Sequence, residues 1–190
     1  MAKMLAGGPL PVILALGHAC RKRPDDSRSA ITNLTLKILG TARKLCGQVE
    51  DRDTVHAAFY LLNGDRRLHL AQNTWDEAGL NAPRKVIGDS GPQDVELVQF
   101  ALNELSHPLR FQYSEDINKF HRFLGAFEVN ATYRSCVVAT VGLGDGASAL
   151  RQGLLVLVSH EVGAFGRSDA EALRLLAGLL AAALAHGNDV

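Results

Sequence analysis

The sequence predicts an α+β fold, an antiparallel sheet of about six strands with helices on its faces. Two β-rich runs, 55–62 and 67–73, are separated by Asn63-Gly64, a pair that is a strong hairpin signal. Two further β-rich runs, 133–141 and 153–158, lie near the end of the chain. Helical periodicity flanks the strands on both sides, and this combination is typical of a layered α+β domain rather than a doubly wound one.

The composition is that of an ordinary globular domain. The chain has 190 residues, of which 47% are hydrophobic and 21% are charged, so one domain with a short appendage is expected. Lys+Arg and Asp+Glu number 20 each, and this balance argues against a direct nucleic-acid partner, which usually requires a basic surplus. The three cysteines show no C-x-x-C spacing, and their sparse use predicts a reducing, cytoplasmic location.

The N-terminal residues 1–28 are expected to lie outside the domain, which spans 29–187. Met4 to Cys20 is uncharged and largely apolar, and Arg21 to Arg28 is a charged linker or an exposed helix start. The apolar stretch is slightly shorter than the roughly 20 residues that a bilayer span needs. Three interpretations remain open: attachment to a membrane, a segment packed on the domain, and a cleaved signal.

The first helix of the domain is predicted from an apolar stripe that Gly47 ends. Its members are Ile31, Leu34, Ile38, Ala42 and Leu45. Leu36, Leu39 and Cys46 widen the apolar arc beyond this stripe. A helix with so wide an apolar arc needs a second partner besides its own sheet.

The strands and the middle helix follow in order. The run 55–62 is apolar on both faces, as expected of a central strand, and both residues of Asn63-Gly64 tolerate the positive φ of a tight turn. Val86-Ile87 is a short strand, and 109–113 is another candidate strand. Between them, Pro92 begins a helix. Its predicted buried stripe is Val95, Val98, Leu102 and Leu105.

The C-terminal third predicts a central strand and a capped amphipathic helix. The run 153–158 is apolar on both faces. Ser168 and Glu171 form an S-x-x-E capping box before the final apolar periodicity.

An apolar surplus on the two terminal helices predicts a symmetric homodimer that buries them in a helical bundle. The predicted interface residues are Ile31, Leu34, Ile38, Leu173, Leu176, Leu180 and Leu184. The alternative is that the domain's own sheet buries the same side chains.

The order and spacing of these elements resemble a GAF domain over roughly residues 29–186. The matching stretches are Val86-Ile87-Gly88-Asp89-Ser90-Gly91, the strand from Arg134 to Ala139, the run from Gly153 to Leu157, and Phe165 followed by Ser168-Asp169. The resemblance implies a GAF/PAS-like six-stranded sheet with the terminal helices on one side and a ligand pocket on the other. Ala170 stands where cyclic-nucleotide-binding members carry Glu, so the resemblance does not extend to that ligand.

A ligand site is predicted in the segment that the resemblance places above the sheet. Residues 114–129 mix aromatic and charged side chains, and pockets combine an apolar lining with a few placed polar groups. The predicted ligand-binding residues are Trp75, Tyr113, Asp116, Phe120, His121, Arg134 and Cys136. The alternative is an ordinary lid with its charges outward. The sequence identifies neither the small-molecule ligand nor a cofactor, and it predicts no metal site.

The predicted function is a small-molecule-sensing or regulatory domain that signals through dimerising terminal helices. Ser159-His160-Glu161 places a nucleophile, a base and a carboxylate side by side, but adjacent strand residues face opposite ways and cannot form a relay. A non-enzymatic protein is therefore expected. Two alternatives remain open: a ligand-free dimerisation scaffold, and a redox enzyme that uses Cys136, like the methionine sulfoxide reductases that resemble GAF domains.

Overall fold

Six strands form one antiparallel sheet in the order β3-β2-β1-β6-β5-β4. The fold is taken from a computed structural model, which describes residues 24–47, 54–75, 84–88, 91, 94–95, 97–99, 111–114, 133–143 and 150–188. The strands are β1 (Val55–Leu62), β2 (Leu68–Asn73), β3 (Val86–Ile87), β4 (Phe111–Ser114), β5 (Ser135–Leu143) and β6 (Leu150–Ser159). The predicted fold class and strand number are confirmed.

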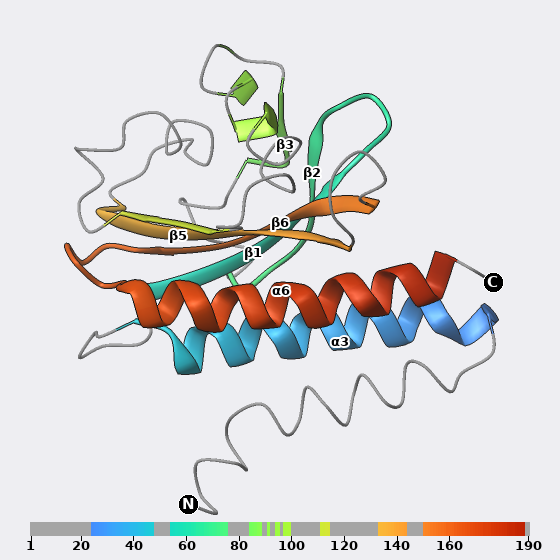
Figure 1. Cartoon of the computed structure of the whole chain (residues 1–190), viewed down its shortest axis with the longest axis horizontal. Helices are drawn as coiled ribbons and strands as arrows, with labels where there is room; N and C mark the ends of the chain where they lie inside the picture. Colours follow the sequence, from blue (N-terminus) through green and yellow to red (C-terminus); the bar gives the residue numbers. More distant parts are fainter. Residues whose placement is uncertain are drawn as a thin grey trace, which may run out of the picture.

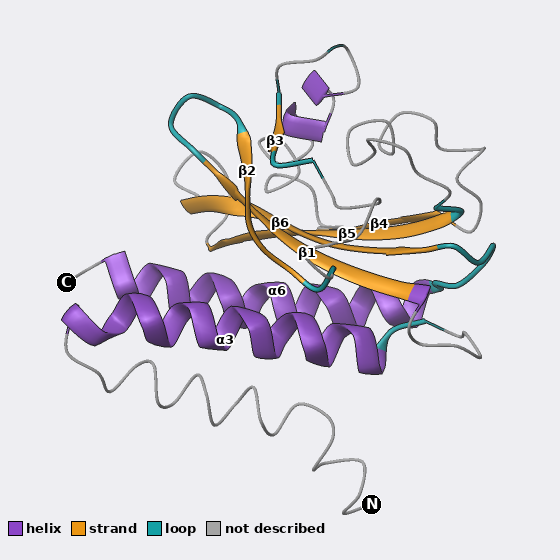
Figure 2. Cartoon of the chain, turned by 180° about the vertical axis from the view of Figure 1, so that it is seen from behind, coloured by secondary structure: helices purple, strands orange, loops and turns teal. Residues whose placement is uncertain are grey.

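Two long helices lie side by side across one face of this sheet (Figure 1). They are α3 (Pro24–Leu45) and α6 (Arg167–Asn188), and each has 22 residues. The view from behind shows both helices again on the same side, with β3 and the projecting end of β2 on the other (Figure 2). The predicted placement of the terminal helices is therefore confirmed.

The larger core lies between the helices and the sheet. Because side chains alternate along a strand, every second residue of the central strands points at the helices. These residues are Val55, Ala57 and Phe59 from β1, Val137, Ala139 and Val141 from β5, and Leu155 and Leu157 from β6. Each fully buried large apolar side chain contributes about 1.5–3 kcal/mol by leaving water.

The residues predicted to form a dimer interface lie in this core instead. Leu34, Ile38, Leu173, Leu176 and Leu180 are all buried within a single chain, and four of the five have no exposed surface. Ile31 and Leu184 are half-buried. The sheet therefore takes up the apolar stripes that suggested a dimer, and the exposed large apolar side chains of the two helices, within the described residues, are Leu36, Leu45 and Leu175.

α3 begins earlier than the predicted domain start, and it ends just before Gly47, as predicted. The helix begins at Pro24, so the end of the predicted charged linker is helical, and proline is favoured in a first turn because its missing N–H needs no partner there. At the other end Leu45 is 44% exposed, and Cys46 is buried in its place. Gly47 follows with φ 96°, as expected of a glycine that ends a helix.

The β1–β2 turn has a different geometry from the predicted Asn-Gly turn. The residue with positive φ is Arg66, at 62°, and Gly64 is not among the positive-φ residues. The Arg66 N–H donates to the Asn63 carbonyl (3.0 Å), and the Asn63 N–H donates to the Arg67 carbonyl (2.9 Å). The loop is therefore longer than a two-residue turn, and its strained position falls on an arginine.

The N-terminus of α6 is capped by other residues than predicted. The helix begins at Arg167, and the Asp169 carboxylate accepts from the Gly166 N–H (2.8 Å), as the third helical residue does in a capping box. Glu171 instead pairs with Arg167 one turn away (3.3 Å), with both side chains exposed. The predicted box at Ser168 and Glu171 is wrong by two positions.

The described part of the middle helix comprises 94–95 and 97–99. Val98 is buried as predicted, but Val95 is 52% exposed and Leu97 is buried in its place. Leu102 and Leu105 lie outside the described residues. Among the helices of the described chain, none combines the length and the apolar character needed to cross a bilayer. Met4 to Cys20 is outside the described residues as well.

Candidate functional site

The sheet face opposite α3 and α6 carries the polar and aromatic groups from which a site could be built. Register places three cross-strand rows on this face of β1, β6 and β5. The rows are His56–Val158–Cys136, Ala58–Val156–Val138 and Tyr60–Leu154–Thr140. Successive rows are about 7 Å apart, because two residues separate them along each strand. Small apolar side chains therefore lie between two rows that contain polar groups.

Four aromatic rings, from His56, Trp75, Tyr133 and His160, form one cluster at the end of this face. His56 stacks on Trp75 with the ring centroids 4.8 Å apart, and Tyr133 stacks on His160 at 4.7 Å. The two stacks meet edge to face, at 6.0 Å between the histidines and 6.2 Å between Trp75 and Tyr133. The indole N–H of Trp75 also donates to the Tyr133 hydroxyl. We call these four residues the aromatic cluster.

Local hydrogen bonds bring the Trp75 side of the cluster into place. The Ala57 N–H donates to the Thr74 hydroxyl (2.9 Å), and the Thr74 N–H donates to the Ala57 carbonyl (2.9 Å). The Asn73 side chain then accepts from the Trp75 N–H (2.9 Å), a turn that asparagine forms readily. This turn at the end of β2 places the indole ring beside His56.

The opposite side of the cluster is held by the turn that follows β6. The Arg134 N–H donates to the Ser159 carbonyl (2.8 Å), and the Ser135 hydroxyl donates to the Glu161 carbonyl (2.7 Å). The Ser159 hydroxyl accepts from the Glu161 N–H (3.1 Å), so it serves the turn. The prediction that Ser159, His160 and Glu161 form no catalytic relay stays a prediction.

A buried ion pair fixes the other side of the face, near β3. The Arg84 guanidinium makes two bonds to the Asp94 carboxylate (2.8 and 2.9 Å), and the Gly88 N–H donates to the same carboxylate (2.9 Å). The Tyr60 hydroxyl donates to the Arg84 carbonyl (3.1 Å). Burial raises the pKa of the Tyr60 hydroxyl far above its usual range, against the opposing effect of the Arg84 charge. Tyr60 is therefore a neutral donor.

Two polar side chains, those of Thr140 and Cys136, are buried on this face. The Thr140 hydroxyl, on a residue that is 5% exposed, has no hydrogen-bond partner in the described structure. The Cys136 thiol is free, and burial raises its pKa to about 12. Thiolates, not thiols, are nucleophilic, and at neutral pH burial keeps Cys136 in the thiol form. Cys46 lies on the helix side of the sheet, so the two buried cysteines cannot pair across it.

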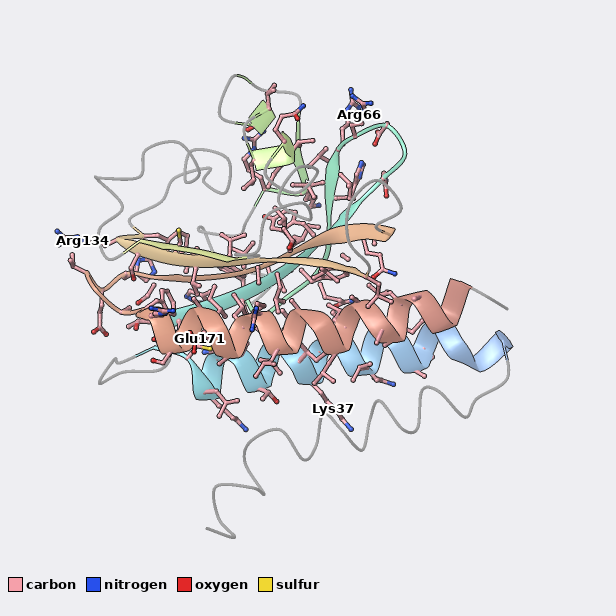
Figure 3. The ribbon with its side chains drawn as sticks, in the orientation of Figure 1. Lys37, Arg66, Arg134 and Glu171 are labelled. Carbon is pink, nitrogen blue, oxygen red and sulfur yellow. The ribbon has the colours of Figure 1, made fainter. Side chains whose placement is uncertain are left out.

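The structure brings together only part of the predicted ligand-binding set. Trp75 belongs to the aromatic cluster, and Cys136 lies buried in the row beside it. Arg134 is exposed and points away from the end of the sheet (Figure 3). The backbone of Tyr113 lies in β4, opposite Val137, and its side chain is not described. Asp116, Phe120 and His121 lie outside the described residues.

Sequence reasoning missed His56, Tyr133, His160 and Thr140. The strand alternation that places Ala58 and Tyr60 on one face also places His56 there, so this signal was present in the first hairpin. Tyr133 and His160 meet only because β5 and β6 pair, and no local pattern reports that contact. Among the described residues, no group of three or more His, Cys, Asp or Glu side chains could hold a metal ion.

Comparisons with known proteins identify the architecture. No protein-family model matches the sequence, and no curated protein matches it. The GAF domain of a phosphoenolpyruvate-protein phosphotransferase from Acinetobacter is 16% identical, with a TM-score of 0.56 over 94% of this chain and 93% of that one. The phycoerythrobilin-bound GAF domain of a cyanobacterial phytochrome is 16% identical, with a TM-score of 0.59 over 94% of this chain and 92% of that one. At this identity the likeness concerns architecture alone, and by its six-stranded sheet and paired terminal helices this chain has the GAF fold.

Proposed function

We propose that this chain is a sensory or regulatory GAF-type domain that binds a small molecule on the sheet face opposite α3 and α6. The observation that carries the proposal is the Thr140 hydroxyl, which is buried on that face with no hydrogen-bond partner in the described structure. Buried polar groups in folded proteins almost always have a partner, and the loss of one costs about 1–3 kcal/mol. A bound molecule with a hydrogen-bonding group would supply it.

The chemistry of the face supports a ligand with a largely apolar body. The row between Thr140 and the aromatic cluster consists of Ala58, Val138 and Val156, which offer small apolar contacts. The row of Thr140 and the row of His56 lie two row spacings apart, about 13 Å along the strands, which is the length of a small fused-ring molecule. The phytochrome GAF domain of the same fold holds phycoerythrobilin, a conjugated pigment, so the fold can accommodate such a body.

The proposed function does not involve catalysis. The nucleophilic candidate Cys136 is held as a thiol by burial, since its pKa is raised to about 12. The cluster histidines stack on aromatic rings. These observations favour binding over the redox alternative.

Signal output is proposed to run through α3 and α6. A ligand changes a protein's state only through a difference in its affinity for two arrangements. We infer that the exposed apolar side chains Leu36 and Leu175 mediate contact with a second copy of the chain. A change in the relative position of α3 and α6 would then change that contact.

Binding is tested by native mass spectrometry and an absorption spectrum of the freshly purified protein. A co-purified mass is expected, and Thr140→Val should reduce its occupancy without lowering the melting temperature of the ligand-free protein, because there the substitution removes a hydroxyl that has no partner. The chain contains a single tryptophan, so the emission of Trp75 reports binding near the cluster. Equal occupancy in wild type and Thr140→Val would refute the role given to Thr140.

A clean apo spectrum leads to the second arm of the test. Purified protein is screened by thermal shift against flat, largely apolar heterocycles, and mass action requires a ligand to raise the melting temperature. A protein that neither co-purifies with a molecule nor responds to any compound would favour the ligand-free scaffold.

A further inference from the structure

Gln152 is a buried polar side chain that joins the sheet to α6. It lies in β6 and is 5% exposed, so its amide requires hydrogen-bond partners. In the orientation that satisfies both polar atoms, its side-chain nitrogen donates to the Ala181 carbonyl (3.1 Å), and its oxygen accepts from the Ala185 N–H (3.1 Å). These bonds tie β6 to the last third of the helix.

A local irregularity of the strand aims this side chain at the helix. Val141 pairs with Gly153, but the next residue of β5, Gly142, pairs with Arg151, so Gln152 is the extra residue of a bulge. Leu154 faces away from the helices, so regular alternation would place Gln152, two residues earlier, on that helix-free face as well. A bulge re-aims one side chain, and here it directs an amide towards α6.

The two backbone atoms that Gln152 contacts are a matched pair. In an α-helix the N–H of Ala185 donates to the carbonyl of Ala181, four residues earlier. The helix can therefore satisfy both atoms by itself when the amide leaves. Side chains that insert at such a pair also bend helices.

We propose that Gln152 is a latch that holds residues 181–188 of α6 against the sheet, and that its release gives this end of the helix a second, looser arrangement. The latch needs no ligand and goes beyond the proposed function. Gln152 acts as a positioning residue, through the helix it holds. Under the proposed function, the latch also has a route to the ligand face: Leu154, two residues along β6, lies in the same row as Thr140.

The latch is tested by NMR hydrogen exchange on the full chain, without ligand, in wild type, Gln152→Met and the matched control Gln72→Met. Methionine keeps the length of the side chain and removes both hydrogen bonds. In Gln152→Met the amides of residues 181–185 should lose protection by about ten-fold or more, while those of 173–177 stay within about two-fold. Gln72 lies in β2, and its side chain makes no hydrogen bond to another described residue. Its substitution should therefore leave the protection of both 181–185 and 173–177 unchanged.

A second variant supplies a readout that simple destabilisation would not give. In Gln152→Glu, the protonated acid can donate to Ala181 and accept from Ala185, whereas the carboxylate cannot donate. Burial raises the pKa of a carboxyl group, so protection of residues 181–185 should return as the pH is lowered, after correction for intrinsic exchange. If Gln152→Met does not fold, the pH dependence of Gln152→Glu and the exchange rate of the Gln152 side-chain amide in wild type test the latch instead. That amide should exchange about ten-fold more slowly than a free one.

Two results would overturn the latch. One is unchanged protection of residues 181–185 in the folded Gln152→Met variant, together with no dependence on pH in Gln152→Glu. The other is a loss of protection spread evenly along α6, because that pattern reports global destabilisation. Neither result bears on whether a small molecule binds, and a failed ligand search leaves the exchange experiment intact.

Discussion

Gly153 is the residue whose identity the fold specifies most strictly. A Cβ placed there would lie 1.9 Å from the Tyr60 carbonyl oxygen, because β1 and β6 pair directly at this point. Backbone atoms of a central strand cannot move aside as the end of a flexible side chain can. Gly153→Ala is therefore expected to lower the free energy of unfolding by about 3 kcal/mol or more, by the overpacking mechanism.

The matched control for this substitution is Gly40→Ala in α3. A Cβ at Gly40 meets nothing within 4 Å. Alanine in a helix interior is better than glycine by about 1 kcal/mol, so this variant should be slightly more stable than wild type. Urea unfolding measures both, and equal losses in the two variants would contradict the close approach at Gly153.

Cys136 makes the stability of the protein sensitive to alkaline pH. Its pKa is raised from 9.0 to about 12 by burial, so the folded state holds the proton more tightly than the unfolded chain does. Stability from this group is complete below pH 9 and is lost as the pH rises from 9 towards 12. The slope is about 1.4 kcal/mol per pH unit for one proton.

Cys136→Val tests this assignment, because it removes the ionisable group and keeps an apolar side chain of similar size. Tyr60 contributes a slope of the same sign at higher pH in both proteins, so the difference between them isolates Cys136. Denaturant unfolding at a series of pH values should show a shallower alkaline decline in the variant. If the stability curves of the two proteins fall in parallel with pH, a group other than Cys136 releases the proton on unfolding.

At the scale of the elements, Asp169 joins the ends of the two long helices. One carboxylate oxygen accepts from the Gly166 N–H at the start of α6, and the other accepts from the Gly47 N–H just after α3 (3.0 Å). The Asp169 carbonyl also accepts from the Cys46 thiol (3.6 Å). One buried side chain thus caps one helix and fixes the end of the other.

Asp169→Ala should lower the free energy of unfolding by about 2–3 kcal/mol, since it removes two hydrogen bonds to a charged acceptor. Glu171→Ala on the same helix removes only an exposed pair with Arg167, and its effect should stay within about 0.5 kcal/mol. Thermal unfolding of the two variants side by side measures the difference. Comparable losses of stability in the two variants would mean that a negative charge near the start of α6 accounts for the effect of Asp169, and that its hydrogen bond to Gly47 does not.

At the scale of the whole molecule, the proposed homodimer has to use side chains that the protomer leaves exposed. Leu175 is 67% exposed on α6 and Leu36 is 44% exposed on α3, whereas Leu180 has no exposed surface. Wild type is expected to sediment as a dimer, and Leu175→Asp as a folded monomer. Leu180→Asp should instead unfold the chain, because it buries a charge in the core.

The control for the dimer experiment is Val162→Asp, which alters an exposed apolar side chain in the turn after β6. That variant should remain dimeric, which separates a general effect of added charge from loss of the interface. Sedimentation velocity measures all four proteins, with circular dichroism to establish folding. A wild type that is monomeric throughout would contradict the dimer outright.

Several elements could be predicted from the sequence because their signals are local. β1 and β3 have the predicted bounds, since β-rich apolar runs and flanking turn residues mark a strand where it lies. The turn at 63–67 and the cap of α6 were predicted with the wrong geometry. Several nearby residues could serve each role, and the choice at Asp169 depends on Gly47, 122 positions away.

The sequence by itself determined the fold class, the six strands and the terminal helices, because hydrophobic periodicity and turn chemistry act over a few residues. Only the tertiary structure decided which apolar stripes are core and which side chains meet on the helix-free face. The aromatic cluster joins four separate segments, and the latch joins residues 152 and 185. Such groups meet because strand pairing and helix docking bring them together, and no local sequence pattern indicates which distant residues will be in contact.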